Sequence, residues 1–351
     1  MGRLIAAALI LCVILSGCRD VFDGHYSSAV PHQAAGGEQI GHRASAKDRQ
    51  ELYDVLAKMV SDGEEEALIS VADYDPELLS DEMWEVRSQL EDQHPIGAYA
   101  VDWISFKEGK SEGERTLTVH IRYIHDRTEI RAIRSVEGME ELERKICQAV
   151  ERYDVGLVLC VQGFESRDLV QVVRSFADEN IHQIMEVPQV TVATYPEKGD
   201  VRVVELRFTY QTDRDTLRSM REQVEPVFQA ANKAARGQED GYRALFDFLI
   251  GGYELHITAS ITPAYSLLKY GVGDSRAFAQ VYDVMCRQAG LECMVVSGTK
   301  DGASHYWNIV RQDGAYYHLD LLGGEYRLLT DQELVGYVWD YAAYPDCDAV
   351  G

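Results

Sequence analysis

The spacing of hydrophobic and polar residues changes repeatedly along the chain after residue 46. Stretches with apolar residues three and four positions apart predict helices, and short stretches of alternating apolar and polar residues predict strands. The expected helices are 47–62, 76–91, 140–153, 166–179 and 214–235, and the expected strands are 67–72, 99–106, 116–123, 155–161, 189–195 and 201–210. Helices and strands mixed in this way predict an α+β fold.

The same order of elements occurs twice in this pattern. The copies match best in their last strand, which reads VHIRY at 119–123 and VELRF at 204–208, each after a polar turn. Alternation puts Val with Ile or Leu on one face and His120 or Glu205 on the other, so one face of each sheet should be exposed. We predict two tandem α+β repeats, 46–153 and 154–236; the alternative is a generic hairpin pattern without an internal repeat.

The first residues have the pattern of a secretory signal. Arg3 precedes an apolar run at 4–15, which is short for a membrane span. The run ends in Leu-Ser-Gly-Cys at 15–18, which resembles the lipobox of bacterial lipoproteins. The resemblance implies a signal peptide at 1–17, whose removal leaves a lipid-carrying Cys18 at the N-terminus. An ordinary signal peptide or a short anchor helix is the alternative.

Residues 18–45 are rich in Gly, Ser, Ala and His and show no apolar period, so we expect a flexible tether. The folded part should then lie outside the cytoplasm, lipid-anchored to the bacterial cell membrane. Multiple acyl chains anchor a protein stably.

The charge of the chain excludes several kinds of partner. Asp and Glu number 58 against 34 Lys and Arg, a formal net charge of −24. Nucleic-acid binding and electrostatic docking on anionic lipid both need a basic surface. Attachment to a membrane would therefore depend on lipid at Cys18, and we expect no nucleic-acid partner.

Cysteine usage predicts neither a disulfide framework nor a metal site. Of seven cysteines, Cys12 lies in the expected signal peptide and Cys18 would carry the lipid; the remaining five are an odd number with no C-x-x-C spacing. One bridge, Cys293 with Cys347, is possible. No cofactor is expected.

The chemical signal lies in the C-terminal third. Residues 270–289 predict a Gly-rich turn leading into a helix, and 304–322 predict a hairpin that turns at Asp313-Gly314. In that register His305 faces Leu322, so Asp320 lies on the same sheet face as His305 at the diagonal position. Side chains of residues in that relation can reach each other.

Three motifs here resemble the transglutaminase-like (papain-like) superfamily: GDSRAFA at 273–279, HYWN at 305–308 and YYHLD at 316–320. In that family a nucleophilic Cys opens a helix, a His lies on a following strand and an Asp on the next. The resemblance covers about 240–348, including the ending YVWDYAAYPDC at 337–347, and implies a papain-like C-terminal domain at 237–351. It makes Ser275, His305 and Asp320 the three catalytic positions, with Ser in place of the nucleophilic Cys.

Other residues around these positions admit two interpretations. A ligand groove would be lined by Asp274, Trp307, Tyr337 and Trp339, but the aromatic residues suit a core equally well. Asp274 and Ser275 can also act simply as a helix cap. Two residues of the second strand, His318 and Tyr316, are expected to face away from the site.

The Cys-to-Ser replacement determines the functional expectation. A Cys beside a His and a helix N-terminus loses its proton readily, whereas a Ser hydroxyl stays protonated and needs general-base help. Cys286 is eleven residues further on, about 16 Å along the helix, and cannot take over. We expect an inactive domain, a pseudoenzyme on the cell surface, that binds a peptide or a cell-wall peptide. The alternatives are a serine-dependent amidase, peptidase or transamidase using Ser275-His305-Asp320, and a structural envelope spacer.

Overall fold

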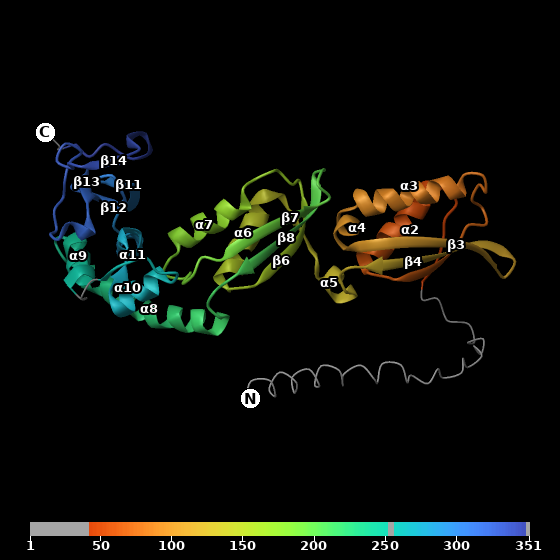
Figure 1. Cartoon of the computed structure of the whole chain (residues 1–351), viewed down its shortest axis with the longest axis horizontal. Coiled ribbons are helices and arrows are strands. Elements are labelled where there is room, and N and C mark those ends of the chain that lie inside the picture. The colour runs from red at the N-terminus through yellow and green to blue at the C-terminus, as the bar shows by residue number, and fades with distance from the viewer. Residues whose placement is uncertain (1–41, 252–255, 349–351) are drawn as a thin grey trace, which may run out of the picture. The chain divides into compact units, whose positions relative to one another are not determined.

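The computed structural model describes residues 42–251 and 256–348 (Figure 1). The expected signal peptide, Cys18 and most of the tether lie outside these residues. Within the described ranges, no helix combines the length and the apolar character needed to cross a membrane.

The first segment is a four-stranded sheet with helices packed on one face. Its strand order is β1-β2-β4-β3, with β1 parallel to β2 and the other pairs antiparallel. Alternate residues of β4, such as Leu117 and Val119, are buried against Leu52 of α2 and Val86 of α3. The elements are β1 (His42–Ser45), α2 (Arg49–Asp62), β2 (Glu66–Ser70), α3 (Leu79–Asp92), α4 (Pro95–Ala100), β3 (Val101–Ser111) and β4 (Glu114–Tyr123).

The second segment has the same strand order and the same strand directions. Its sheet runs β5-β6-β8-β7, with β5 parallel to β6 and the other pairs antiparallel. The helix α5 (Arg127–Ala132) precedes it. The elements are β5 (Arg134–Glu137), α6 (Gly138–Glu151), β6 (Gly156–Gln162), α7 (Leu169–Glu179), β7 (Gln189–Tyr195) and β8 (Val201–Thr209). Matching order is what a tandem repeat would give, but a common origin of the two segments stays a prediction.

Three predicted boundaries differ from the structure. Residues 42–45, assigned to the tether, form β1, which pairs with β2. The helix assigned to the end of the first repeat is α6, and its Leu142 and Ile146 pack with β6 and β8 of the second sheet. The helix α8 (Arg214–Ala235), assigned to the second repeat, packs Phe228 against the C-terminal helices. The strand β1 is placed by its pairing with β2, and α6 and α8 are placed by the surfaces that bury their apolar faces.

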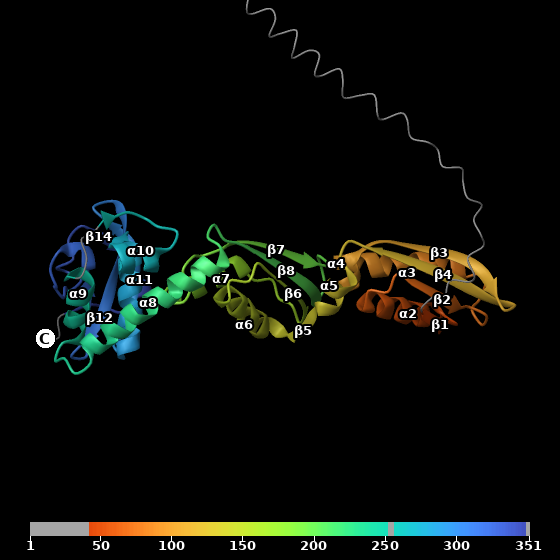
Figure 2. The same ribbon diagram turned by 90° about the horizontal axis from the view of Figure 1, so that it is seen from below.

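The C-terminal segment has helices on one face of a four-stranded sheet. The sheet order is β13-β12-β11-β14, and Figures 1 and 2 show α8 alongside α10 and α11. Val310 and Leu319 pack with these helices, whereas Trp307 and Ile309 belong to a separate core on the opposite face. The elements are α9 (Gly241–Gly251), β9 (His256–Ile257), α10 (Pro263–Tyr270), β10 (Val272–Gly273), α11 (Ser275–Ala289), β11 (Cys293–Lys300), β12 (Ala303–Gln312), β13 (Ala315–Leu319), η1 (Leu321–Gly323), β14 (Tyr337–Trp339) and η2 (Tyr341–Ala343).

The predicted hairpin register is confirmed. Gln312 pairs with Ala315, and the pairing continues to Asn308 opposite Leu319. Asp313 and Gly314 both have positive φ, 52° and 85°, as a two-residue hairpin turn that follows the strand twist requires.

Candidate functional site

Ser275 is the first residue of α11, as the helix-start motif predicted. Asp274 caps the helix, because its extended backbone lets Oδ1 accept from the Ala277 N–H at 2.9 Å. The Ser275 Oγ accepts a hydrogen bond of 3.2 Å from the backbone N–H of Tyr306 on β12. The hydroxyl therefore lies at a helix N-terminus, beside the strand that carries His305.

His305 and Asp320 form the contact that the register predicts. His305 Nε2 lies 3.1 Å from Asp320 Oδ2, and both side chains are largely buried, 12% and 5% exposed. A carboxylate only accepts hydrogen bonds, so Nε2 carries the proton. When the ring is neutral, Nδ1 is then free to accept a proton.

Asp320 is shared with two further donors. Lys300 Nζ lies 2.8 Å and the Tyr337 hydroxyl 2.6 Å from the same Oδ2 atom, while Oδ1 accepts from the Leu322 N–H at 3.0 Å. Burial acts to raise the pKa of Asp320, but hydrogen bonds from His305, Lys300 and Tyr337 outweigh it and hold the pKa well below its usual range. Asp320 is thus a fixed anion.

In a catalytic triad, a third contact would join Ser275 to His305. Within residues 42–251 and 256–348, no hydrogen bond joins Ser275 Oγ to the His305 ring. The ring lies on the Trp307 side of the sheet, with centroids 6.2 Å apart and planes at 21°. The Asn308 amide, on the opposite side, donates to the Ala279 carbonyl of α11 at 2.9 Å. The structure brings together two of the three triad positions and places the third beside the same strand.

Two of the residues predicted to line a ligand groove belong to the core. Trp307 is completely buried and Trp339 is 8% exposed, so both are core residues. The Tyr337 hydroxyl is held by Asp320. Asp274 does line a cavity, of about 310 Å³, together with Arg276.

Lys300 is a site residue that the sequence interpretation missed. It ends β11 and lies next to the turn Asp301-Gly302, whose φ angles of 52° and 82° match the other hairpin turn. The resulting register pairs Lys300 with Ala303 and Gly298 with His305. The same two-residue turn signal that located Asp320 would therefore have put Lys300 on the face of His305.

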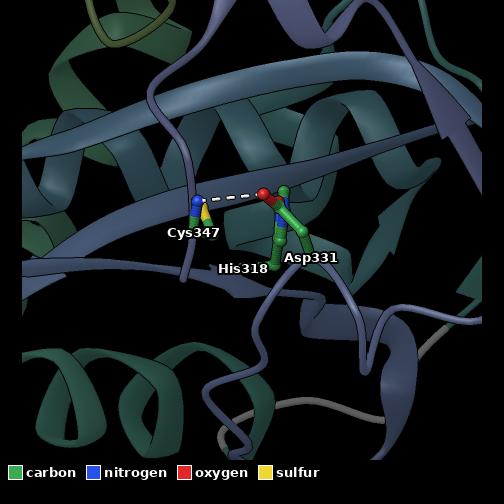
Figure 3. A group of neighbouring side chains, drawn as sticks. All are labelled: His318, Asp331 and Cys347. Atoms are coloured by element: carbon green, nitrogen blue, oxygen red, sulfur yellow. Dashed lines mark hydrogen bonds and ion pairs between the residues drawn. The ribbon is translucent and has the colours of Figure 1, made fainter. Parts of the chain in front are cut away.

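A second His–Asp pair lies on the same sheet face. His318 was expected to face away, but the register puts it opposite Ile309, within the core of Trp307. Its Nε2 lies 2.8 Å from Asp331 Oδ1, and Cys347 lies beside both residues (Figure 3). The three ligand atoms lie within 4.8 Å of one another, close enough together for one metal ion.

Hydrogen bonding argues against a metal at this cluster, which we call the His318 cluster. Trp307 Nε1–H donates to His318 Nδ1 at 2.9 Å, so the ring proton must be on Nε2, the atom that faces Asp331. A metal needs a lone pair on that atom, and a ligating His donates through its other nitrogen. The donor set therefore fits a hydrogen-bond chain from Trp307 through His318 to Asp331.

The same cluster holds Cys347 in place. The Cys347 N–H donates to Asp331 Oδ2 at 3.1 Å, the bond drawn in Figure 3, and the Asp331 N–H donates to the Cys347 carbonyl at 2.9 Å. Burial lowers the pKa of His318, partly offset by Asp331. The possible bridge between Cys293 and Cys347 is not formed, because Cys293 packs with the helices and Cys347 lies in the opposite core.

A comparison with protein families matches part of this segment. The family model of the transglutaminase-like superfamily matches residues 226–321, from within α8 to just past Asp320. The chain therefore contains a transglutaminase-like domain within these residues, as the sequence predicted. No curated protein matches the chain.

Solved structures give weaker likenesses. A transglutaminase (TGase) crystal structure is 9% identical over 66% of this chain and 68% of its own, with a TM-score of 0.27. A protein proposed to be a cysteine protease, from Cytophaga hutchinsonii, is 16% identical over 44% of this chain and 68% of its own, with a TM-score of 0.26. The periplasmic domain of TgpA from Pseudomonas aeruginosa is 17% identical over 35% of this chain and 53% of its own, with a TM-score of 0.23.

Proposed function

We propose that this chain is a membrane-anchored surface lipoprotein whose transglutaminase-like domain binds a peptide, or a peptide of the cell wall, without catalysing a reaction. One observation carries the proposal. Ser275 stands at the nucleophile position of the motif, and its Oγ is bonded to the Tyr306 N–H and not to His305. The hydroxyl thus lacks the low pKa of a cysteine and is not hydrogen bonded to His305.

The surface beside Ser275 supports a binding role. The cavity of about 310 Å³ has Asp274 and Arg276 on its polar side and Ile184, Ile261 and Pro263 among its apolar residues. Apolar walls with a few fixed polar groups are typical of ligand sites. An extended peptide would place a side chain on the apolar wall and its backbone next to the start of α11.

We expect Ile261→Asp to weaken the binding of a cell-wall stem peptide by about tenfold or more, because a charge buried against the ligand is costly. Ile261 is 51% exposed, so the substitution should leave the fold intact. Isothermal titration of the peptide into the purified chain measures the effect. Val335→Asp is the matched control, since Val335 is 85% exposed and does not line this cavity.

The same titration separates binding from a structural role. Equal affinities in the two variants would contradict a ligand site at this cavity. No binding by the natural chain would favour the envelope spacer.

One observation favours the serine-dependent enzyme as the second candidate. Because His305 Nε2 is bonded to Asp320, Nδ1 is the ring atom left to accept a proton from Ser275. Labelling of Ser275 by a fluorophosphonate probe would support an amidase, peptidase or transamidase. Its absence would support the non-catalytic role.

For the anchor, we expect Cys18→Ala to move the chain from the membrane pellet to the soluble fraction. Without acyl chains on Cys18, an acidic protein has no electrostatic attraction to an anionic bilayer. Fractionation of cells and immunoblotting measure the shift, and circular dichroism checks the fold. Recovery of the variant in the pellet would contradict lipid anchoring.

A further inference from the structure

Lys300 lies on β11, next to the strand of His305, and contacts Asp320 of the His305–Asp320 pair. Its Nζ is 2.8 Å from Asp320 Oδ2, the atom that also contacts His305 Nε2 at 3.1 Å. The Lys300 side chain is 32% exposed, whereas that of Asp320 is 5% exposed. The ammonium also lies 4.9 Å from the centroid of the Tyr337 ring. One carboxylate oxygen thus accepts hydrogen bonds from an ammonium, a hydroxyl and an imidazole.

This sharing changes what Asp320 can do for His305. In a working nucleophile–histidine site, the carboxylate orients the ring and stabilises the positive charge that the ring gains with a proton. Here the carboxylate already has a cation on the same oxygen. Because both nitrogens contact that atom, Lys300 Nζ is no more than about 6 Å from His305 Nε2, and like charges at that range repel in a half-buried site.

The two aromatic residues beside the ring carry no compensating charge. Tyr337 stays a neutral hydroxyl, since burial and the hydrogen bond to Asp320 raise its pKa to about 12. Trp307 faces the ring and is uncharged. Ser275 and its neighbour Asp274 lie at the α11 start, where the Asp274 carboxylate is bonded to the Ala277 N–H.

We propose that Lys300 is a second block on catalysis: its ammonium compensates the negative charge of Asp320, so that this carboxylate orients His305 without stabilising a proton taken from the nucleophile position. The blocked step is transfer of a proton from the side chain at position 275 to His305 Nδ1, which leaves a negative nucleophile and a positive ring. Lys300 acts through Asp320 and is a positioning residue. The inference rests on the proposed non-catalytic role, and it attributes the lack of catalysis to Lys300 as well as to Ser275.

The test compares three chains that carry a thiol at position 275: Ser275→Cys alone, with Lys300→Met, and with Lys300→Arg. Met keeps the length of the side chain and removes its charge, whereas Arg keeps the charge. We expect Lys300→Met to lower the pH of half-maximal alkylation by iodoacetamide by about one unit, and to raise the rate near pH 6 about tenfold. Lys300→Arg should leave the profile where Ser275→Cys alone has it.

Superimposable profiles for the Met and Arg variants would overturn the role of Lys300. Thermal unfolding checks that each chain is folded, and Lys300→Gln replaces Lys300→Met if the latter is not. Tyr337→Phe, which removes a donor to the same oxygen without a change of charge, should shift the profile less. The assay uses no ligand. A negative result would therefore overturn the role of Lys300 without contradicting the proposed lack of catalysis in the natural chain. Conversely, hydrolysis by the natural chain would overturn the proposed function whatever the profiles show.

Discussion

Replacing Ser275 with cysteine should give a thiol that iodoacetamide alkylates at pH 7 at least about 100-fold faster than Cys286 or Cys293. The new thiol would lie at the first residue of α11, where the helix end and the Tyr306 N–H both stabilise a thiolate. Cys286 is fully buried, and burial raises the pKa of Cys293 well above its usual range. Mass spectrometry of the three cysteine peptides against time gives the rates.

Ser297→Cys is the matched control for this experiment. Ser297 is an exposed residue in the middle of β11 and is not the first residue of a helix. A thiol at 275 that reacts no faster than the one at 297 would leave capping of α11 as the better account of this position. Hydrolysis by the natural chain that is lost in Ser275→Ala would instead favour the serine-dependent enzyme.

The parts of the site that the sequence predicted are those set by local geometry. A two-residue turn fixes the register of both its strands, so Asp313-Gly314 was enough to place Asp320 beside His305. A capping residue at the start of an apolar period was enough to put Ser275 at a helix N-terminus. Lys300 was open to the same argument through Asp301-Gly302.

The parts that the sequence did not predict depend on which surfaces meet. The apolar faces of α6 and α8 are clear in the sequence, but their spacing does not say which core receives them, and both were assigned to the preceding segment. Alternation likewise marks Trp307 as facing one side of the sheet. Only the packing of Trp339 and Cys347 over it shows that this side is a core and not a groove.

The His318 cluster yields the second large effect, on stability. Asp331→Ala should lower the free energy of unfolding by about 2–4 kcal/mol, because it leaves the His318 Nε2–H and the Cys347 N–H without their acceptor in a buried site. Urea unfolding at pH 7.5 measures the loss. Asp346→Ala is the control, since Asp346 is an exposed acid one residue before Cys347 and should change little. Equal losses of stability in the two variants would contradict a stabilising role for the hydrogen-bond chain from Trp307 through His318 to Asp331.

The pH dependence of unfolding tests the assigned proton positions. Since burial lowers the pKa of His318, the unfolded chain takes up a proton more readily than the folded one. This contribution to stability is therefore complete above the ordinary histidine pKa, about 6.5, and is lost as the pH falls from there toward the lower folded value. His318→Gln should unfold with a weaker pH dependence between 7.5 and 5 than the natural chain.

Added Zn²⁺ should leave the midpoint of urea unfolding of the natural chain unchanged, because the Trp307 N–H keeps the His318 proton on the nitrogen that a metal would need. If Zn²⁺ raises this midpoint and Cys347→Ala abolishes the rise, the metal binds at the His318 cluster and displaces the hydrogen-bond chain.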